Sequence, residues 1–168
     1  YGICVSYPGA YCAEEVAEHS MALLLACARR ILRLDKAVRQ GNWGFPARHE
    51  MTEIWMPIFQ LAEQTLGIIG FGRIGRLIVP KAKGFGLRVI AYDPHVPLNV
   101  FKELGVESVT LDHLLRESDY ISVNAALTDE THHLLGIEQF RMMKPTAYFI
   151  NCARAELADE EALYTALA

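Results

Sequence analysis

The sequence predicts an α/β domain built on a doubly wound parallel sheet, with the strand order 3-2-1-4-5 and a truncated C-terminal end. Two observations lead to this prediction. Short apolar runs alternate with helical patterns along most of the chain, which is typical of parallel strands joined by crossover helices. The first of these runs, residues 66–69, leads directly into a glycine-rich turn. A strand followed by such a turn and a helix is the usual start of this architecture.

The glycine-rich turn has the spacing G-x-G-x-x-G. Gly70 permits a tight turn, Gly72 lets the backbone approach a pyrophosphate, and Gly75 lets helix and strand pack closely. The helix that follows offers free N–H groups to phosphates, so Arg73 and Ile74 are also expected at the ligand. The pattern indicates a Rossmann-type dinucleotide site; the alternative is a glycine-rich turn in another α/β domain.

Asp93 provides the context that favours the dinucleotide site. It ends a second apolar run, residues 88–92, about twenty residues beyond the glycines, where an NAD site needs a carboxylate for the ribose hydroxyls. The same carboxylate would repel a 2′-phosphate, and no arginine follows it, so the sequence predicts NAD and not NADP. The alternative is a turn residue placed before Pro94.

The composition indicates a globular chain and argues against several classes of protein. Of 168 residues, 52% are hydrophobic and 21% charged, with a net charge of −4 and no Lys/Arg cluster, which argues against direct binding of nucleic acid. The four cysteines form no C-x-x-C pair and the histidines show no metal spacing, so we expect reduced thiols, a cytoplasmic location and no metal. No apolar run approaches the ~20 residues of a membrane span.

Before the glycines, the sequence predicts a short extended run, a long helix over residues 12–41 and an irregular segment over residues 42–64. Residues 21–28 are apolar nearly all round, so this helix should be buried on more than one side. Its second side could lie in its own domain or in a second subunit. The irregular segment contains Trp43 and Trp55, and its aromatic groups are expected to dock on the domain or on a partner.

Beyond Asp93 the alternation continues. Strands are expected at residues 106–109, 120–123 and 147–150, and helices at 100–104, 112–116, 137–142 and after 159. Asp112 and Asp159 are the expected helix caps. Ligands of such sheets bind at the carboxyl ends of the strands, so the glycine turn, Asp93 and the loops that start at Asn124 and Asn151 should converge on one crevice.

These residues resemble the D-isomer-specific 2-hydroxyacid dehydrogenases over nearly the whole chain. The matching stretches are residues 16–19, 66–75, 92–94, 118–122, 127–128, 130–131, 143–145, 150–151, 153–154 and 159–163. The resemblance implies an NAD-binding domain inserted within a substrate domain. Residues 1–11 would then be the crossover, residues 12–41 the helix of a homodimer interface, and residues 65–168 the Rossmann core. It favours the shared-helix interpretation of residues 21–28.

The resemblance also implies an oxidoreductase that transfers hydride between NAD and a D-2-hydroxy acid or 2-oxo acid. The family's arginine for the substrate carboxylate falls on Arg154. We expect Asn151 to brace this loop, and the alternative interpretation of Arg154 is a surface arginine paired with Glu156 or Asp159. The loops beside the cofactor would hold Asn124, Ala125, Ala126, Cys152 and Ala153. The family's glutamate and acid/base histidine match no position in the printed chain, so these 168 residues alone are expected to bind NAD without turnover.

The sequence departs from the family's pattern in three places. Residues 124–126 read Asn-Ala-Ala where the family usually has His-x-Pro, Asp129 stands in place of proline, and Ala155 in place of glycine. The first change bears on cofactor affinity and the last on substrate choice. The aromatic segment before residue 66, together with residues 131–135, is similar to the branch of C-terminal-binding proteins, which are dehydrogenase-like corepressors. The second interpretation is therefore an NAD(H)-sensing regulatory module without significant turnover.

Overall fold

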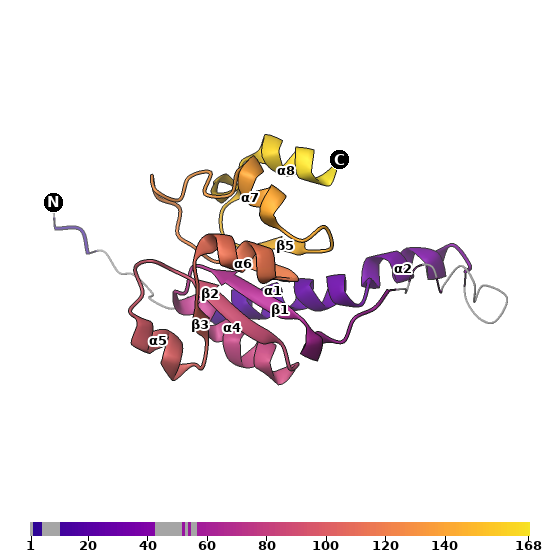
Figure 1. Ribbon diagram of the computed structural model, residues 1–168, viewed down its shortest axis with the longest axis horizontal. Coiled ribbons are helices and arrows are strands. Elements are labelled where there is room, and N and C mark those ends of the chain that lie inside the picture. The colour runs from indigo at the N-terminus through magenta and orange to yellow at the C-terminus, as the bar shows by residue number, and fades with distance from the viewer. Residues whose placement is uncertain (1, 5–10, 43–51, 53, 55–56) are drawn as a thin grey trace.

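The computed structural model describes residues 2–4, 11–42, 52, 54 and 57–168. In this part of the chain a parallel sheet in the order β3-β2-β1-β4-β5 lies between two layers of helices (Figure 1). The predicted fold class and strand order are therefore confirmed. None of the described helices combines the length and the apolar character that crossing a membrane requires.

The strands lie close to their predicted positions, and all their pairings are parallel. Their bounds are β1 (Thr65–Ile69), β2 (Arg88–Tyr92), β3 (Glu107–Ser108), β4 (Tyr120–Val123) and β5 (Tyr148–Asn151). The central strand β1 is buried along its whole length and pairs with β2 on one side and β4 on the other. Strands that are covered on both faces carry continuous apolar runs, which is why these were recognisable without a structure.

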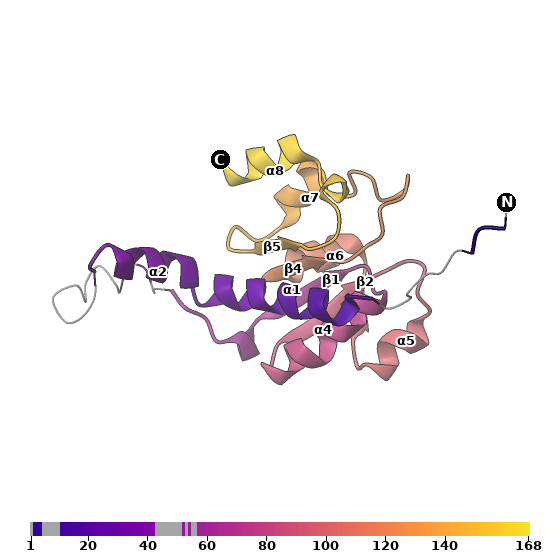
Figure 2. The ribbon, with the colours of Figure 1, turned by 180° about the vertical axis from the view of Figure 1, so that it is seen from behind.

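Each face of the sheet is covered by its own helices. α1 (Ala13–Ala28) and α4 (Arg73–Gly84) pack on one face, and α6 (Leu111–Glu117), α7 (Ile137–Met142) and α8 (Glu160–Leu167) lie on the other side (Figure 2). α5 (Leu98–Glu103) follows β2, and the 3₁₀ helices η2 (Leu61–Glu63) and η3 (Ala155–Leu157) precede β1 and α8. Two apolar clusters result, one for each face of the sheet.

The prediction of a single long helix over residues 12–41 is wrong. The structure has two helices, α1 and α2 (Ile31–Arg39), because Arg30 adopts a left-handed backbone conformation with a φ of 51°. The Arg30 guanidinium donates hydrogen bonds to the carbonyls of Ile54 at 2.8 Å and Pro57 at 3.1 Å. Non-glycine residues rarely adopt this conformation, so such contacts help to offset its cost.

α1 has one buried face and one exposed apolar face. Met21, Leu24 and Ala28 are buried against the rest of the domain. Ala22 is exposed and Leu23 keeps 37% of its exposure. Within the described part of this chain, α1 is therefore buried on one side only. Its other side leaves a strip of apolar residues on the surface.

The two predicted helix caps have different outcomes. Asp159 caps α8 as predicted, since its Oδ1 accepts a hydrogen bond of 2.8 Å from the N–H of Ala162. The prediction of Asp112 as the cap of α6 is wrong, because the Thr110 hydroxyl accepts the N–H of His113 at 3.3 Å. Threonine and aspartate both cap helices well, so residue type alone did not separate the two positions.

The aromatic segment over residues 42–64 is described only in part. Trp43 and Trp55 lie outside the described residues. Among those described, Leu61 is buried in the core, whereas Ile58 and Phe59 are exposed on this chain. The segment therefore presents apolar groups at the surface next to β1.

Gly67 in β1 allows α6 to approach the sheet closely. A Cβ at this position would lie 2.2 Å from the Ser118 hydroxyl oxygen and 2.6 Å from Cδ2 of Leu114. The Ser118 hydroxyl donates a 2.6 Å hydrogen bond to the Leu114 carbonyl, so it is held in this position. The helix layer therefore rests directly on the glycine backbone.

We expect Gly67→Ala to lower the free energy of unfolding by about 1–3 kcal/mol, the usual cost of overpacking a core. The matched control is Gly84→Ala at the end of α4, where a Cβ would meet no described atom within 4 Å. That control should raise the free energy of unfolding by about 0.5–1 kcal/mol, because alanine favours the helix. Urea titrations measure both values, and changes of the same sign would contradict this packing.

Candidate functional site

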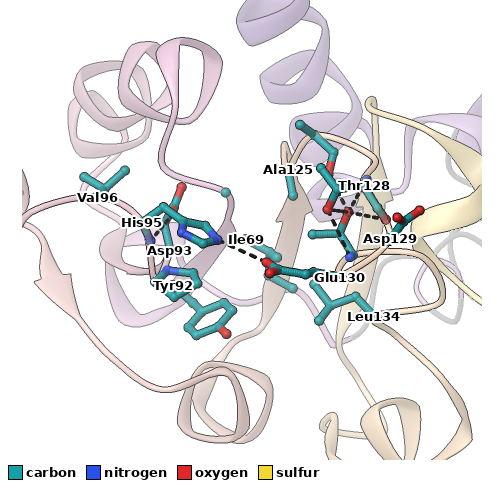
Figure 3. Close-up of a pocket in the computed structure, with 14 residues that line it drawn as sticks. Ile69, Tyr92, Asp93, His95, Val96, Ala125, Thr128, Asp129, Glu130 and Leu134 are labelled. Carbon is teal, nitrogen blue, oxygen red and sulfur yellow. Dashed lines mark hydrogen bonds and ion pairs between the residues drawn. The ribbon is translucent and has the colours of Figure 1, made fainter.

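The carboxyl ends of β1, β2 and β4 border a pocket of about 730 Å³ (Figure 3). Gly70 after β1, Asp93 after β2, and Ala125 and Ala126 after β4 contribute to its lining. The structure thus brings three of the four predicted loops together. The fourth loop, residues 151–154, follows the neighbouring strand β5 and is not part of this lining.

The turn after β1 requires glycine at two positions for reasons within the protein. Gly70 has a φ of +89°, and a Cβ there would lie 2.4 Å from the backbone nitrogen of Ala125. A Cβ at Gly75 would lie 2.4 Å from the carbonyl oxygen of Gly70. Both distances are far below van der Waals contact, so these glycines set how closely α4 and the β4 loop approach the turn.

Gly72 differs from these two glycines, because the described protein places nothing against it. A Cβ at Gly72 would meet no described atom within 4 Å. Gly72 is the N-cap of α4 and supplies no side-chain cap to the helix. The N–H groups of Arg73, Ile74 and Gly75 have no partner within the helix, and they lie at its positive end, which suits a phosphate.

Asp93 connects the end of β2 to the glycine turn. Its Oδ2 accepts the N–H of Phe71 at 2.8 Å, and its Oδ1 accepts the N–H of His95 at 3.0 Å. Asp93 is thus a turn residue before Pro94 and also a lining residue of the pocket. A carboxylate offers about four lone-pair sites, so two backbone bonds leave room for hydroxyl donors of a ribose.

Asn124 starts the loop after β4 and contains an unsatisfied acceptor. Its N–H donates to the carbonyl of Ile69 at 2.7 Å, and its Nδ2 donates to the carbonyl and hydroxyl oxygens of Ser122. Its Oδ1 is buried without a hydrogen-bond partner in the described structure. Buried polar atoms are rarely left unpaired, so this oxygen is a place where a ligand donor would be favourable.

The loop after β5 is braced by Asn151, as predicted. Its Nδ2 donates to the Arg154 carbonyl at 2.8 Å, and its Oδ1 accepts the N–H of Ala153 at 3.0 Å. The Arg154 guanidinium is exposed and, among the described residues, donates only to the Ala153 carbonyl, at 3.0 Å. Among the described residues, no carboxylate lies within 4.0 Å of the Arg154 guanidinium. The alternative interpretation, in which Arg154 forms a surface ion pair with Glu156 or Asp159, is therefore not what the structure has. Cys152 is half-buried in the same loop.

One pair of residues at the pocket was not predicted. Nε2 of His95, in the loop after β2, lies 3.4 Å from Oε2 of Glu130, in the loop after β4 (Figure 3). The two residues are far apart in sequence, and although Glu130 lies in a stretch that matches the family, nothing in the sequence links it to His95. The one signal in the sequence that could have predicted this contact is that both residues lie in loops that follow strands of the same sheet.

None of the pKa shifts resolved for the described residues belongs to a residue that lines the pocket. Burial, with smaller effects of Tyr148 and Asp119, raises the pKa of Tyr120 to about 12, and its hydroxyl donates to Gln64 at 2.8 Å. Burial also raises the pKa of the Cys27 thiol. In the described part of the chain no three His, Cys, Asp or Glu side chains are grouped to hold a metal ion.

The family model described as "D-isomer specific 2-hydroxyacid dehydrogenase, NAD binding domain" matches residues 21–168. The chain belongs to this family. A glyoxylate reductase of Korarchaeum cryptofilum is 43% identical over 166 residues, which cover 99% of this chain and 49% of that protein. A hydroxypyruvate reductase of Thermotoga maritima is 42% identical over 157 residues, 94% of this chain and 47% of that protein.

Solved structures of the dehydrogenase family agree with this result. D-lactate dehydrogenase from Aquifex aeolicus, complexed with NAD and lactic acid, superposes with a TM-score of 0.85 at 37% identity, covering 99% of this chain and 47% of that one. The chain spans about half the length of the relatives it matches. None of these relatives is a corepressor, and the comparisons give the regulatory alternative no support.

The site fits the NAD that this domain of the family binds. Because Gly72 has no side chain, the space beside it is open, and a Cβ would occupy part of that space. This space lies at the start of α4, where no side chain caps the helix, and a pyrophosphate needs such free N–H groups. Asp93 keeps acceptor capacity beside the pocket. No described lysine or arginine lines that pocket, in keeping with NAD as the cofactor.

We expect Gly72→Ala in the intact protein to weaken NADH binding by about tenfold or more, because its Cβ would enter the space left for the pyrophosphate. The free energy of unfolding should change by less than about 1 kcal/mol. Gly70→Ala is the comparison variant and should lose both stability and binding, since its Cβ meets backbone. Fluorescence titration and urea unfolding measure the two quantities, and unchanged NADH affinity in Gly72→Ala would exclude this position for the pyrophosphate.

Proposed function

We propose that the intact protein is an NAD-dependent oxidoreductase that interconverts a 2-oxo acid and the D-2-hydroxy acid. The observation that supports this most directly is Arg154, an exposed guanidinium on a loop that Asn151 braces at the carboxyl end of β5. An arginine without a carboxylate partner, beside a dinucleotide site, is suited to bind an anionic substrate.

We assign the cofactor contacts to three groups of residues. Gly70, Gly72, Arg73, Ile74 and Gly75 would contact the pyrophosphate, since they form the turn and the first turn of α4. Asp93 would accept hydrogen bonds from the ribose hydroxyls. The loops after β4 and β5 would contact the nicotinamide half, through Asn124, Ala125, Ala126, Cys152 and Ala153. The unpaired Oδ1 of Asn124 is the acceptor in this group.

Bound NAD supplies hydride exchange at its nicotinamide ring. Arg154 would orient the substrate, because a guanidinium matches the plane of a carboxylate with two parallel hydrogen bonds. Its charge would also favour the negative charge that develops on the ketone oxygen. Asn151 would keep the guanidinium in place by fixing the backbone at Ala153 and Arg154.

The substrate we propose is a small 2-oxo acid such as glyoxylate, hydroxypyruvate or pyruvate. The relatives named above are reductases or dehydrogenases of these acids or of their reduced forms. Ala155, which follows Arg154, places a methyl group where the resemblance expects glycine. A methyl group next to the substrate arginine is more compatible with a short side chain on the acid.

We further propose a homodimer formed through α1 around residues 21–28. Leu23 on α1, before the break at Arg30, and Leu32 on α2, after it, are both exposed on this chain, and a second subunit would cover them. A cytoplasmic location is proposed from the cysteines, all of which are free thiols.

In the intact protein Arg154→Lys should keep NADH binding and stability but lower kcat/KM for the best 2-oxo acid by about two orders of magnitude or more. A lysine retains the charge and loses the paired hydrogen bonds. The matched control is Arg141→Lys on α7, an exposed arginine paired with Glu138 at 2.8 Å, which should keep normal turnover. Near-normal kcat/KM in Arg154→Lys would remove Arg154 as the substrate anchor.

Leu23→Glu should weaken dimerisation of the intact protein by about a hundredfold or more, because it would bury an unpaired charge at the interface. Leu98→Glu is the control, since Leu98 is exposed on α5 and is not part of the proposed interface helix. Sedimentation velocity at several concentrations measures the association. A wild-type protein that stays monomeric well above micromolar concentration, or a Leu23→Glu variant that dimerises normally, would refute the proposed interface.

A further inference from the structure

The His95–Glu130 pair spans the pocket without a role in the fold. The side chains keep 75% and 78% of their exposure, so the pair contributes little to stability. The two residues come from loops that follow different strands, β2 and β4, and both line the pocket. Figure 3 shows the two side chains extending toward each other from opposite sides.

His95 lies at the place where an NADP site needs a cation. Its N–H donates to Oδ1 of Asp93 at 3.0 Å, so its backbone lies beside the carboxylate proposed for the ribose hydroxyls. In related dinucleotide sites, a basic side chain near this carboxylate accommodates a 2′-phosphate. Of the described residues that line the pocket, His95 is the only basic one.

Glu130 changes what this histidine can do. The pocket lining includes the carboxylates of Asp93, Asp129 and Glu130, and Glu130 is the one paired with His95. The titratable groups that share the pocket with His95 are these three, together with Tyr92. A 2′-phosphate, with about −1.5 to −2 charges, would meet carboxylates on both sides of the pocket and a histidine already paired with one of them.

We propose that Glu130 is a second determinant of cofactor choice, which excludes 2′-phosphorylated dinucleotides by holding His95 away from the phosphate and by facing the phosphate with a carboxylate. The proposal rests on the cofactor site described above. Asp93 acts by direct repulsion at the ribose, and Glu130 acts across the pocket.

The test compares NAD⁺ and NADP⁺ binding to the intact protein by titration calorimetry at pH 6.0. Glu130→Gln should tighten NADP⁺ binding about fivefold to tenfold at pH 6.0 and change NAD⁺ binding by less than about twofold. The double variant with His95→Gln should lose most of the gain at pH 6.0.

Glu138→Gln is the matched control, an exposed, ion-paired glutamate on α7 that should leave both affinities unchanged. A Glu130→Gln protein with an unaltered NADP⁺ to NAD⁺ ratio at pH 6.0 would overturn the inference, as would a gain that the double variant keeps in full. If the wild-type protein binds NAD⁺ and Glu130→Gln leaves the ratio of the two affinities unchanged, only the inference about Glu130 is refuted. If the wild-type protein binds neither dinucleotide, the proposed cofactor site is refuted as well.

Discussion

The close backbone approach at Gly70 is the constraint on which the rest of the site depends. Here β1 ends, and the Gly70 N–H donates to the Tyr92 carbonyl of β2 at 2.9 Å. On the other side, the Asn124 N–H donates to the Ile69 carbonyl at 2.7 Å. A side chain at Gly70 would collide with the β4 loop, so the ends of three strands meet only because this residue has none. The pocket lies over that junction.

Groups of opposite charge lie on the two sides of this junction. The side of β2 presents the Asp93 carboxylate, which also stabilises the glycine turn through Phe71. The side of β5 presents the Arg154 guanidinium on a loop that Asn151 holds. The carboxylate proposed for the ribose and the guanidinium proposed for a substrate anion are thereby separated by the width of the central strands. This order suits a dinucleotide that lies across the carboxyl edge of the sheet.

Much of this arrangement was predictable from the sequence, because local patterns determine it. Buried parallel strands carry apolar runs, which the sequence shows directly. The glycine spacing matches steric requirements that the structure confirms at Gly70 and Gly75. Asn151 braces its loop through hydrogen bonds to residues only two and three positions further along the chain. What escaped prediction depends on contacts between distant segments. Arg30 interrupts a pattern without glycine or proline and binds carbonyls at residues 54 and 57. The His95–Glu130 pair likewise exists only once two loops have met.

A crystal structure of the intact protein with NAD tests the central claim most directly. The account predicts the pyrophosphate within hydrogen-bond distance of the N–H groups at the start of α4, over the space beside Gly72. It also predicts the adenosine ribose on the Asp93 carboxylate and the nicotinamide toward the loops of Asn124 and Arg154. A pyrophosphate bound away from Gly72, or a ribose that does not contact Asp93, would contradict it.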